Sequence, residues 1–74
     1  MRYSVDFFIG LASVDDVTDL LMMTSDGEYW EMVESVERFD NGVIVTTKDL
    51  DGYDRDDLYA VLAEEYGWSA VSEL

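Results

Sequence analysis

The 74-residue sequence contains no cysteine and no histidine. Without cysteine there is no disulfide framework and no thiolate zinc site, and we expect a protein of the reducing cytoplasm. Without histidine the commonest general base and metal ligand is missing, and Ser-His and Cys-His catalytic arrangements are excluded. A pair of catalytic carboxylates would need an apolar pocket, for which a domain of this size has little room. We therefore expect no enzymatic activity, no cofactor and no metal ion.

Long hydrophobic runs and basic residues are scarce as well. No apolar run approaches the roughly 20 residues that span a bilayer. The first six residues include Asp6 and no continuous apolar stretch, which argues against a signal peptide. The basic residues are Arg2, Arg38, Lys48 and Arg55. Anionic lipids and nucleic acids would both repel such a chain, so we expect no membrane binding and no direct nucleic-acid binding.

Acidic residues dominate the chain: 18 Asp and Glu give a formal net charge of −14. Self-repulsion at this level opposes compaction, and natural sequences that break a local rule often do so for function. The apolar content of 49% and the Tyr, Phe and Trp residues are typical of a globular protein rather than a disordered acidic tail. The composition therefore predicts a single acidic domain over residues 1–74.

The first third of the chain shows a strand pattern followed by a helix pattern. Residues 3–11 alternate, with Phe8 on the opposite face from a predicted core set of Tyr3, Val5, Phe7, Ile9 and Leu11. Ser13 is a predicted helix cap. The apolar stripe of that helix is Val14, Val17, Leu20 and Leu21. Ser25-Asp26-Gly27 is a turn signal that ends the helix.

Residues 28–39 allow two interpretations. As a helix, Ser25 and Glu28 form a capping box, and the stripe is Tyr29, Met32, Val33 and Val36. As a strand, the segment places Trp30, Met32 and Val36 on one face and enters the hairpin turn Asp40-Asn41-Gly42. An Asn-Gly pair between apolar runs is a strong hairpin signal, and the predicted strand 43–47 needs a neighbour. We therefore favour the hairpin.

The last third of the chain predicts a helix and a short strand. Asp54 is the predicted cap, Gly67 the predicted end, and the stripe is Leu58, Val61, Leu62 and Tyr66. Residues 68–74 suffice for one more strand. The order strand, helix, strand, strand, helix, strand predicts a ferredoxin-like βαββαβ fold, with an antiparallel sheet and two helices on one face. A helix at 28–39 would give a different α+β arrangement.

Three acidic clusters are the candidate binding residues. The first cluster lies in the opening turns of the first predicted helix and consists of Asp15, Asp16 and Asp19. The second recurs every three residues and consists of Glu28, Glu31, Glu34 and Glu37. The third follows the predicted strand 43–47 and consists of Asp49, Asp51, Asp54, Asp56 and Asp57. The third cluster fails as an EF-hand calcium loop, because Tyr53, Asp54 and Ala60 fall on positions 5, 6 and 12. A solvated surface explains such clusters as well as a binding surface does.

Small size, extreme acidity, the lack of catalytic residues and a compact α+β pattern together resemble the phage-encoded DNA-mimic inhibitors of the anti-CRISPR and anti-restriction type. The resemblance covers the overall character of the chain and no motif. It implies an inhibitor, monomeric or weakly dimeric, in the host cytoplasm. Its carboxylates would occupy the Lys/Arg groove of a basic DNA-handling protein, specifically a CRISPR surveillance complex, and so block DNA.

Two other interpretations remain open. An extreme halophile also uses acidic, lysine-poor domains, and an acidic immunity protein would inhibit a basic nuclease. The first of these differs from mimicry in where the acids lie: a mimic concentrates them in a stripe, whereas halophilic acids coat every face.

Overall fold

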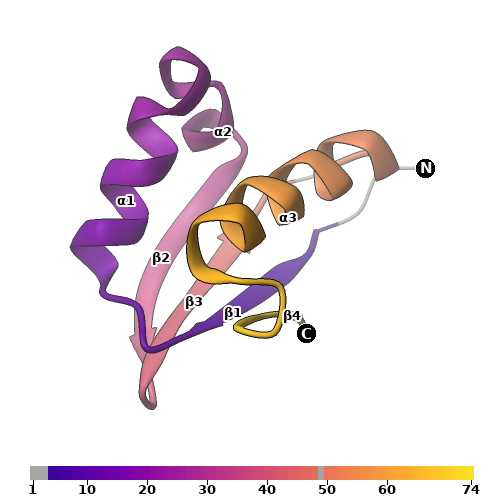
Figure 1. The fold of residues 1–74 in the computed structure, drawn as a ribbon. Coiled ribbons are helices and arrows are strands. Elements are labelled where there is room, and N and C mark those ends of the chain that lie inside the picture. Colours follow the sequence, from indigo (N-terminus) through magenta and orange to yellow (C-terminus); the bar gives the residue numbers. More distant parts are fainter. Residues whose placement is uncertain (1–3, 49) are drawn as a thin grey trace.

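A computed structural model of the protein describes residues 4–48 and 50–74. Its elements in chain order are β1 (Asp6–Gly10), α1 (Val14–Met23), the 3-10 turn η1 (Thr24–Gly27), α2 (Glu28–Glu31), β2 (Val33–Phe39), β3 (Gly42–Thr47), α3 (Gly52–Tyr66) and β4 (Val71–Glu73). The strands form an antiparallel sheet in the order β2-β3-β1-β4. Helices α1 and α3 lie side by side over one face of this sheet (Figure 1). The predicted α+β class and antiparallel sheet are confirmed.

Strand β1 supplies the centre of the core. Phe7 and Ile9 are fully buried under the helices, while Phe8 faces the opposite side and is half-buried. The predicted core position of Leu11 is wrong: it has a φ of 60° and is 86% exposed. The chain has already turned out of the sheet at this point, with the Leu11 N–H donating to the Asn41 carbonyl at 2.9 Å. Tyr3 lies outside the described residues.

The first helix follows the prediction. The Ser13 hydroxyl accepts a hydrogen bond from the Asp16 N–H at 3.1 Å, which confirms the cap. Val17 and Leu21 are fully buried, and Val14 and Leu20 pack at the margin of the core. The predicted turn is confirmed too, because Ser25, Asp26 and Gly27 all have positive φ and reverse the chain direction.

Residues 28–39 divide between the two interpretations. A single helical turn occupies Glu28–Glu31 and the strand begins at Val33, so the hairpin is confirmed and a helix over 28–39 is wrong. Trp30 and Met32 precede the strand rather than forming part of it. The reason is tertiary: β2 pairs with β3 from Val33 onward, with a bulge between Val33 and Ser35.

Helix α3 begins earlier than predicted. Its cap is Asp51, whose Oδ1 accepts from the Asp54 N–H at 2.8 Å, so the prediction of Asp54 as the cap is wrong. Asp54 is already in the first helical turn and supplies the N–H rather than the acceptor. Leu58 and Leu62 are fully buried as predicted, and Gly67 ends the helix as predicted, with a φ of 98°.

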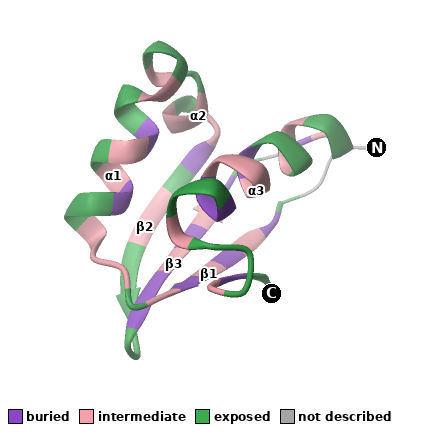
Figure 2. Ribbon diagram, in the orientation of Figure 1, coloured by how far each residue is buried: buried purple, intermediate pink, exposed green. Residues whose placement is uncertain are grey.

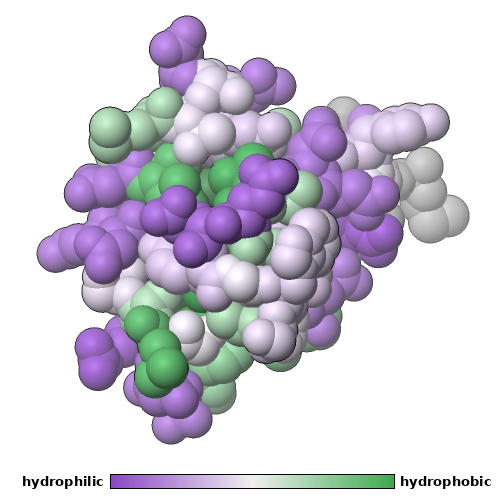
Figure 3. All heavy atoms as spheres, viewed as in Figure 1, coloured by the Kyte–Doolittle hydropathy of each residue, from purple (hydrophilic) through white to green (hydrophobic). Residues whose placement is uncertain are grey.

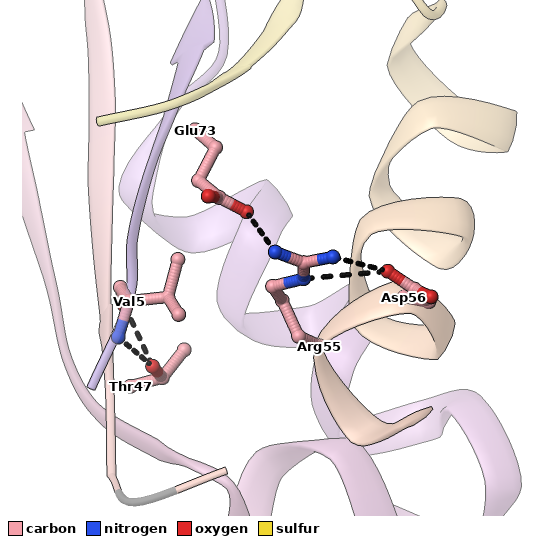
Figure 4. Close-up of polar contacts among 5 residues, drawn as sticks. All are labelled: Val5, Thr47, Arg55, Asp56 and Glu73. Carbon is pink, nitrogen blue, oxygen red and sulfur yellow. Dashed lines mark hydrogen bonds and ion pairs between the residues drawn. The ribbon is translucent and has the colours of Figure 1, made fainter. Parts of the chain in front are cut away.

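Burial is concentrated between the helices and the sheet (Figure 2). Thr47 is the buried polar residue of this core, and its hydroxyl accepts from the Val5 N–H at 2.9 Å and donates to the Val5 carbonyl at 2.6 Å (Figure 4). These bonds tie the start of β1 to the end of β3. None of the helices in the described part of the chain combines the length and apolar character of a membrane-spanning segment.

Candidate functional site

The described carboxylates gather on the helical side of the molecule. We call α1, η1, α2 and α3, with the α3 cap, the acidic helical layer; its acids are Asp15, Asp16, Asp19, Asp26, Glu28, Glu31, Asp51, Asp54, Asp56, Asp57, Glu64 and Glu65. The same elements carry one basic residue, Arg55. In the space-filling view from this side, hydrophilic residues surround and cross smaller hydrophobic patches (Figure 3). The helical layer therefore presents strong negative charge.

The opposite, outer face of the sheet carries much less charge. Burial of Phe7, Ile9, Val43 and Val45 toward the helices leaves the alternate positions facing outward. Those outward positions on β1, β2 and β3 are Asp6, Phe8, Gly10, Ser35, Glu37, Phe39, Gly42, Ile44 and Thr46. Two of them are acidic. The charge is therefore distributed unevenly between the two sides of the fold.

The structure places the three predicted acidic clusters in different ways. Asp15, Asp16 and Asp19 are exposed along α1, as expected. The series spaced by three is not one helical row, because Glu28 and Glu31 lie on α2 whereas Glu34 and Glu37 lie on β2. The chain changes from helix to strand at Met32, and all four side chains are exposed.

The third cluster is only partly free for binding. Asp49 lies outside the described residues. Asp51 and Asp54 are half-buried, and the Asp51 carboxylate is engaged as the α3 cap. Asp56 pairs with Arg55 at 3.0 Å, and Asp57 is exposed. Asp57 is therefore the member of this cluster best placed to meet a partner.

Tyr29 shows that acids from two helices converge. Burial of its phenol raises the pKa of Tyr29 above the ordinary value of 10.0, and the negative charges of Asp57, Glu28, Asp54 and Glu64 raise it further. The phenol on α2 thus lies within the field of three carboxylates on α3. Acids of the second and third clusters, which are far apart in the sequence, therefore lie near the same side chain.

Tyr66 marks a second convergence at the other end of α3. Burial raises the pKa of Tyr66, and the charges of Asp16 on α1 and Glu65 on α3 add to the effect. Sequence reasoning missed Glu64 and Glu65. Two adjacent glutamates in the last turns of a helix oppose the helix dipole, and this unfavourable placement was the available signal.

Replacing Tyr29 with phenylalanine tests this arrangement. The raised pKa of Tyr29 means that the unfolded chain loses the phenol proton first, so the free energy of unfolding falls as the pH rises above 10.0 through the folded pKa. We expect Tyr29→Phe to reduce that fall and to leave stability near neutral pH almost unchanged. Urea unfolding of both proteins from about pH 8 to about pH 11 measures the difference. An identical fall in the variant would contradict the convergence around Tyr29.

Arg55 neutralises part of the helical layer. Its guanidinium pairs with Asp56 at 3.0 Å within α3 and reaches Glu73 on β4 at 3.6 Å (Figure 4). These partly exposed pairs contribute little to stability, but they link the helical layer to the edge of the sheet. Within residues 4–48 and 50–74, no group of three acidic side chains is arranged to hold a metal ion.

No family model, no curated protein and no solved structure matches this chain. Its function is therefore inferred from its own charge distribution and geometry.

Proposed function

We propose that the protein is a non-enzymatic inhibitor that binds a basic, DNA-handling complex and blocks DNA by imitating phosphate charge. The specific candidate is a CRISPR surveillance complex. One observation carries the proposal: 12 of the 17 described acids lie on the helical layer, whereas the outward strand positions of β1, β2 and β3 hold two, Asp6 and Glu37. A mimic requires such concentration on one side, and halophilic solvation does not.

The mechanism follows from the way in which the DNA-binding groove of a protein recognises a duplex. Phosphate contacts position a duplex through charge and spacing, and sequence is read separately at base edges. Carboxylates held on rigid helices can therefore occupy the same Lys/Arg groups. Carboxylates of more than one helix lie close enough to Tyr29 and to Tyr66 to raise the pKa of each phenol, so the charges of different helices act over the same parts of the surface. Opposite fields steer the encounter, so association should be fast and should slow as salt is added.

We also propose that the fold is a ferredoxin-like split βαβ arrangement and that the protein works in the cytoplasm. Support for the fold is the succession of β1, α1, β2, β3, α3 and β4, with β1 at the centre between β3 and β4. Helix α2 is a single extra turn within that succession. Support for the cytoplasm is the absence of cysteine.

A competition measurement tests the function directly. A purified DNA-binding CRISPR surveillance complex is incubated with labelled target duplex, and the protein is titrated in a gel-shift assay. We expect the duplex to be released as the protein binds, without a species that contains both. A stable ternary complex, or no binding, would contradict charge mimicry of DNA on this partner.

The behaviour of the fold in salt separates mimicry from halophilic adaptation. At about 0.01 M salt the Debye length is about 30 Å, so the carboxylates repel one another most strongly. We expect circular dichroism to show a folded chain even there, with a melting temperature that rises by a few degrees at about 0.15 M salt. A chain that folds only in molar salt would make the acidity a solvation adaptation.

A further inference from the structure

The outer face of the sheet carries an apolar patch at its centre, formed by Phe8, Phe39 and Ile44. Phe8 is paired with Ile44 across β1 and β3, and the ring centroids of Phe8 and Phe39 lie 6.1 Å apart in an edge-on contact. Phe39 is 55% exposed, and the other two side chains are half-buried. No described helix covers this face, because α1 and α3 lie on the other side (Figure 1).

Two glycines lie beside these rings in the sheet. Gly10 and Gly42 are paired in the row beside the patch, and Phe39 is paired with Gly42. A Cβ on Gly42 would collide with the Ile9 carbonyl, so this position requires glycine. A Cβ on Gly10 would lie 3.8 Å from the Phe8 ring, which therefore passes close to bare backbone. The Phe8 ring thus lies close to the backbone at Gly10, and Phe39 remains largely exposed.

The charged side chains at the outward positions of β1, β2 and β3 are all acidic. Glu37 is paired with Ile44 and lies beside the patch, and Asp6 lies one row away on β1. The outward positions of β1, β2 and β3 hold no Lys or Arg. Any segment that packs on the three apolar side chains thus meets carboxylates on the same surface.

We propose that the outer face is a second interaction surface, and that its occupant is a basic polypeptide segment of a partner protein with apolar side chains between its Lys or Arg residues. The apolar side chains pack on Phe8, Phe39 and Ile44, and the cations reach Glu37 and Asp6. An arginine can also stack on the Phe39 ring. This surface is separate from the acidic helical layer and does not depend on its function.

Charge complementarity decides against two other occupants. Aromatic side chains on an open sheet can stack the bases of single-stranded nucleic acid. Here the phosphates would meet Glu37, Asp6 and a net charge of −14. A second copy of the chain would bring the same −14 against itself.

Two synthetic peptides of equal length and charge test the proposal, one alternating Arg with Leu and the other alternating Arg with Ser. Calorimetry should show the Arg-Leu peptide binding on the order of tenfold more tightly, since each buried CH₂ contributes about 0.8 kcal/mol. Amide resonances of β1, β2 and β3 should shift with the Arg-Leu peptide in two-dimensional NMR spectra. Equal affinities, or shifts confined to the helices, would overturn the proposal.

Variants distinguish peptide binding through the apolar patch from general electrostatic attraction to the acidic protein. Phe39→Thr with Ile44→Thr should lower the affinity for Arg-Leu to that for Arg-Ser, and threonine retains the β-propensity of the strands. Glu37→Lys, which leaves the patch intact, should weaken both peptides. Asp57→Lys with Glu64→Lys on α3 should preserve the preference for Arg-Leu.

Three further outcomes complete the test. Stronger binding of an oligouridylate than of the Arg-Leu peptide, or concentration-dependent dimerisation that Phe39→Thr with Ile44→Thr abolishes, would replace the proposed occupant. If the protein still prefers the Arg-Leu peptide but does not compete with duplex DNA for the surveillance complex, the proposed outer-face surface is supported and the DNA-mimic function is rejected.

Discussion

Reversing the charges of Asp57 and Glu64 together is expected to weaken competition with duplex DNA by roughly 10- to 100-fold, because like charges facing each other across an interface cost several kcal/mol. Both side chains are exposed on α3, and both contribute to the field at Tyr29. They are seven positions apart, so they share one face of the helix. Neither caps a helix, and their replacement by lysine should leave the fold intact.

The matched control reverses two acids on the outer face of the sheet. Asp6→Lys with Glu37→Lys changes the net charge by the same amount and is expected to alter DNA competition by less than about threefold. Circular dichroism confirms that both variants are folded before the gel-shift titration. Asp51 is unsuitable for such variants, because its carboxylate caps α3. If both pairs weaken competition equally, net charge rather than its placement governs the effect, and the mimic proposal fails.

Replacing Phe7 with alanine is expected to lower the free energy of unfolding by about 3–5 kcal/mol. Phe7 is fully buried on the central strand, and its ring packs edge-on against Tyr59 of α3, with centroids 5.8 Å apart. The Tyr59 hydroxyl donates to the Val71 carbonyl on β4 at 3.0 Å. The Phe7 ring therefore supports the contact of α3 with both β1 and β4.

The loss is large relative to the stability available. Small domains have free energies of unfolding near the low end of about 5–15 kcal/mol, and the repulsion among the acids lowers this further. Most Phe7→Ala molecules should therefore be unfolded at low ionic strength and partly recovered by salt. Urea unfolding at two salt concentrations measures both effects.

Tyr53 supplies the control for an aromatic deletion. Its side chain is 84% exposed in the first turn of α3, and Tyr53→Ala should change stability by no more than about 0.5 kcal/mol. A buried aromatic usually contributes more than this to stability. If Phe7→Ala lowers the free energy of unfolding by less than about 1.5 kcal/mol, the Phe7 ring is not central to the core.

Local patterns predicted most of the secondary structure, and they failed at the ends of elements. Alternation identified Phe7, Phe8 and Ile9 correctly, but it continued to Leu11, where the chain leaves the sheet with a φ of 60°. Asp51 and Asp54 both suit a helix cap, and spacing alone does not choose between them. The choice depends on where the backbone changes from extended to helical, and Asp51 is still extended.

Composition and local spacing were enough to predict the charge of the protein, the absence of histidine and cysteine chemistry, the hairpin at Asp40-Asn41-Gly42 and the class of fold. These properties depend on composition or on residues a few positions apart. Which acids lie near one another depends instead on how the helices and strands are arranged in space. The regular series from Glu28 to Glu37 is divided between a helix and a strand, whereas Glu28 and Glu64, 36 positions apart in the sequence, both act on Tyr29. The fold brings the acids of α3 close enough to α2 to act on Tyr29, and no local period encodes the proximity of separate elements.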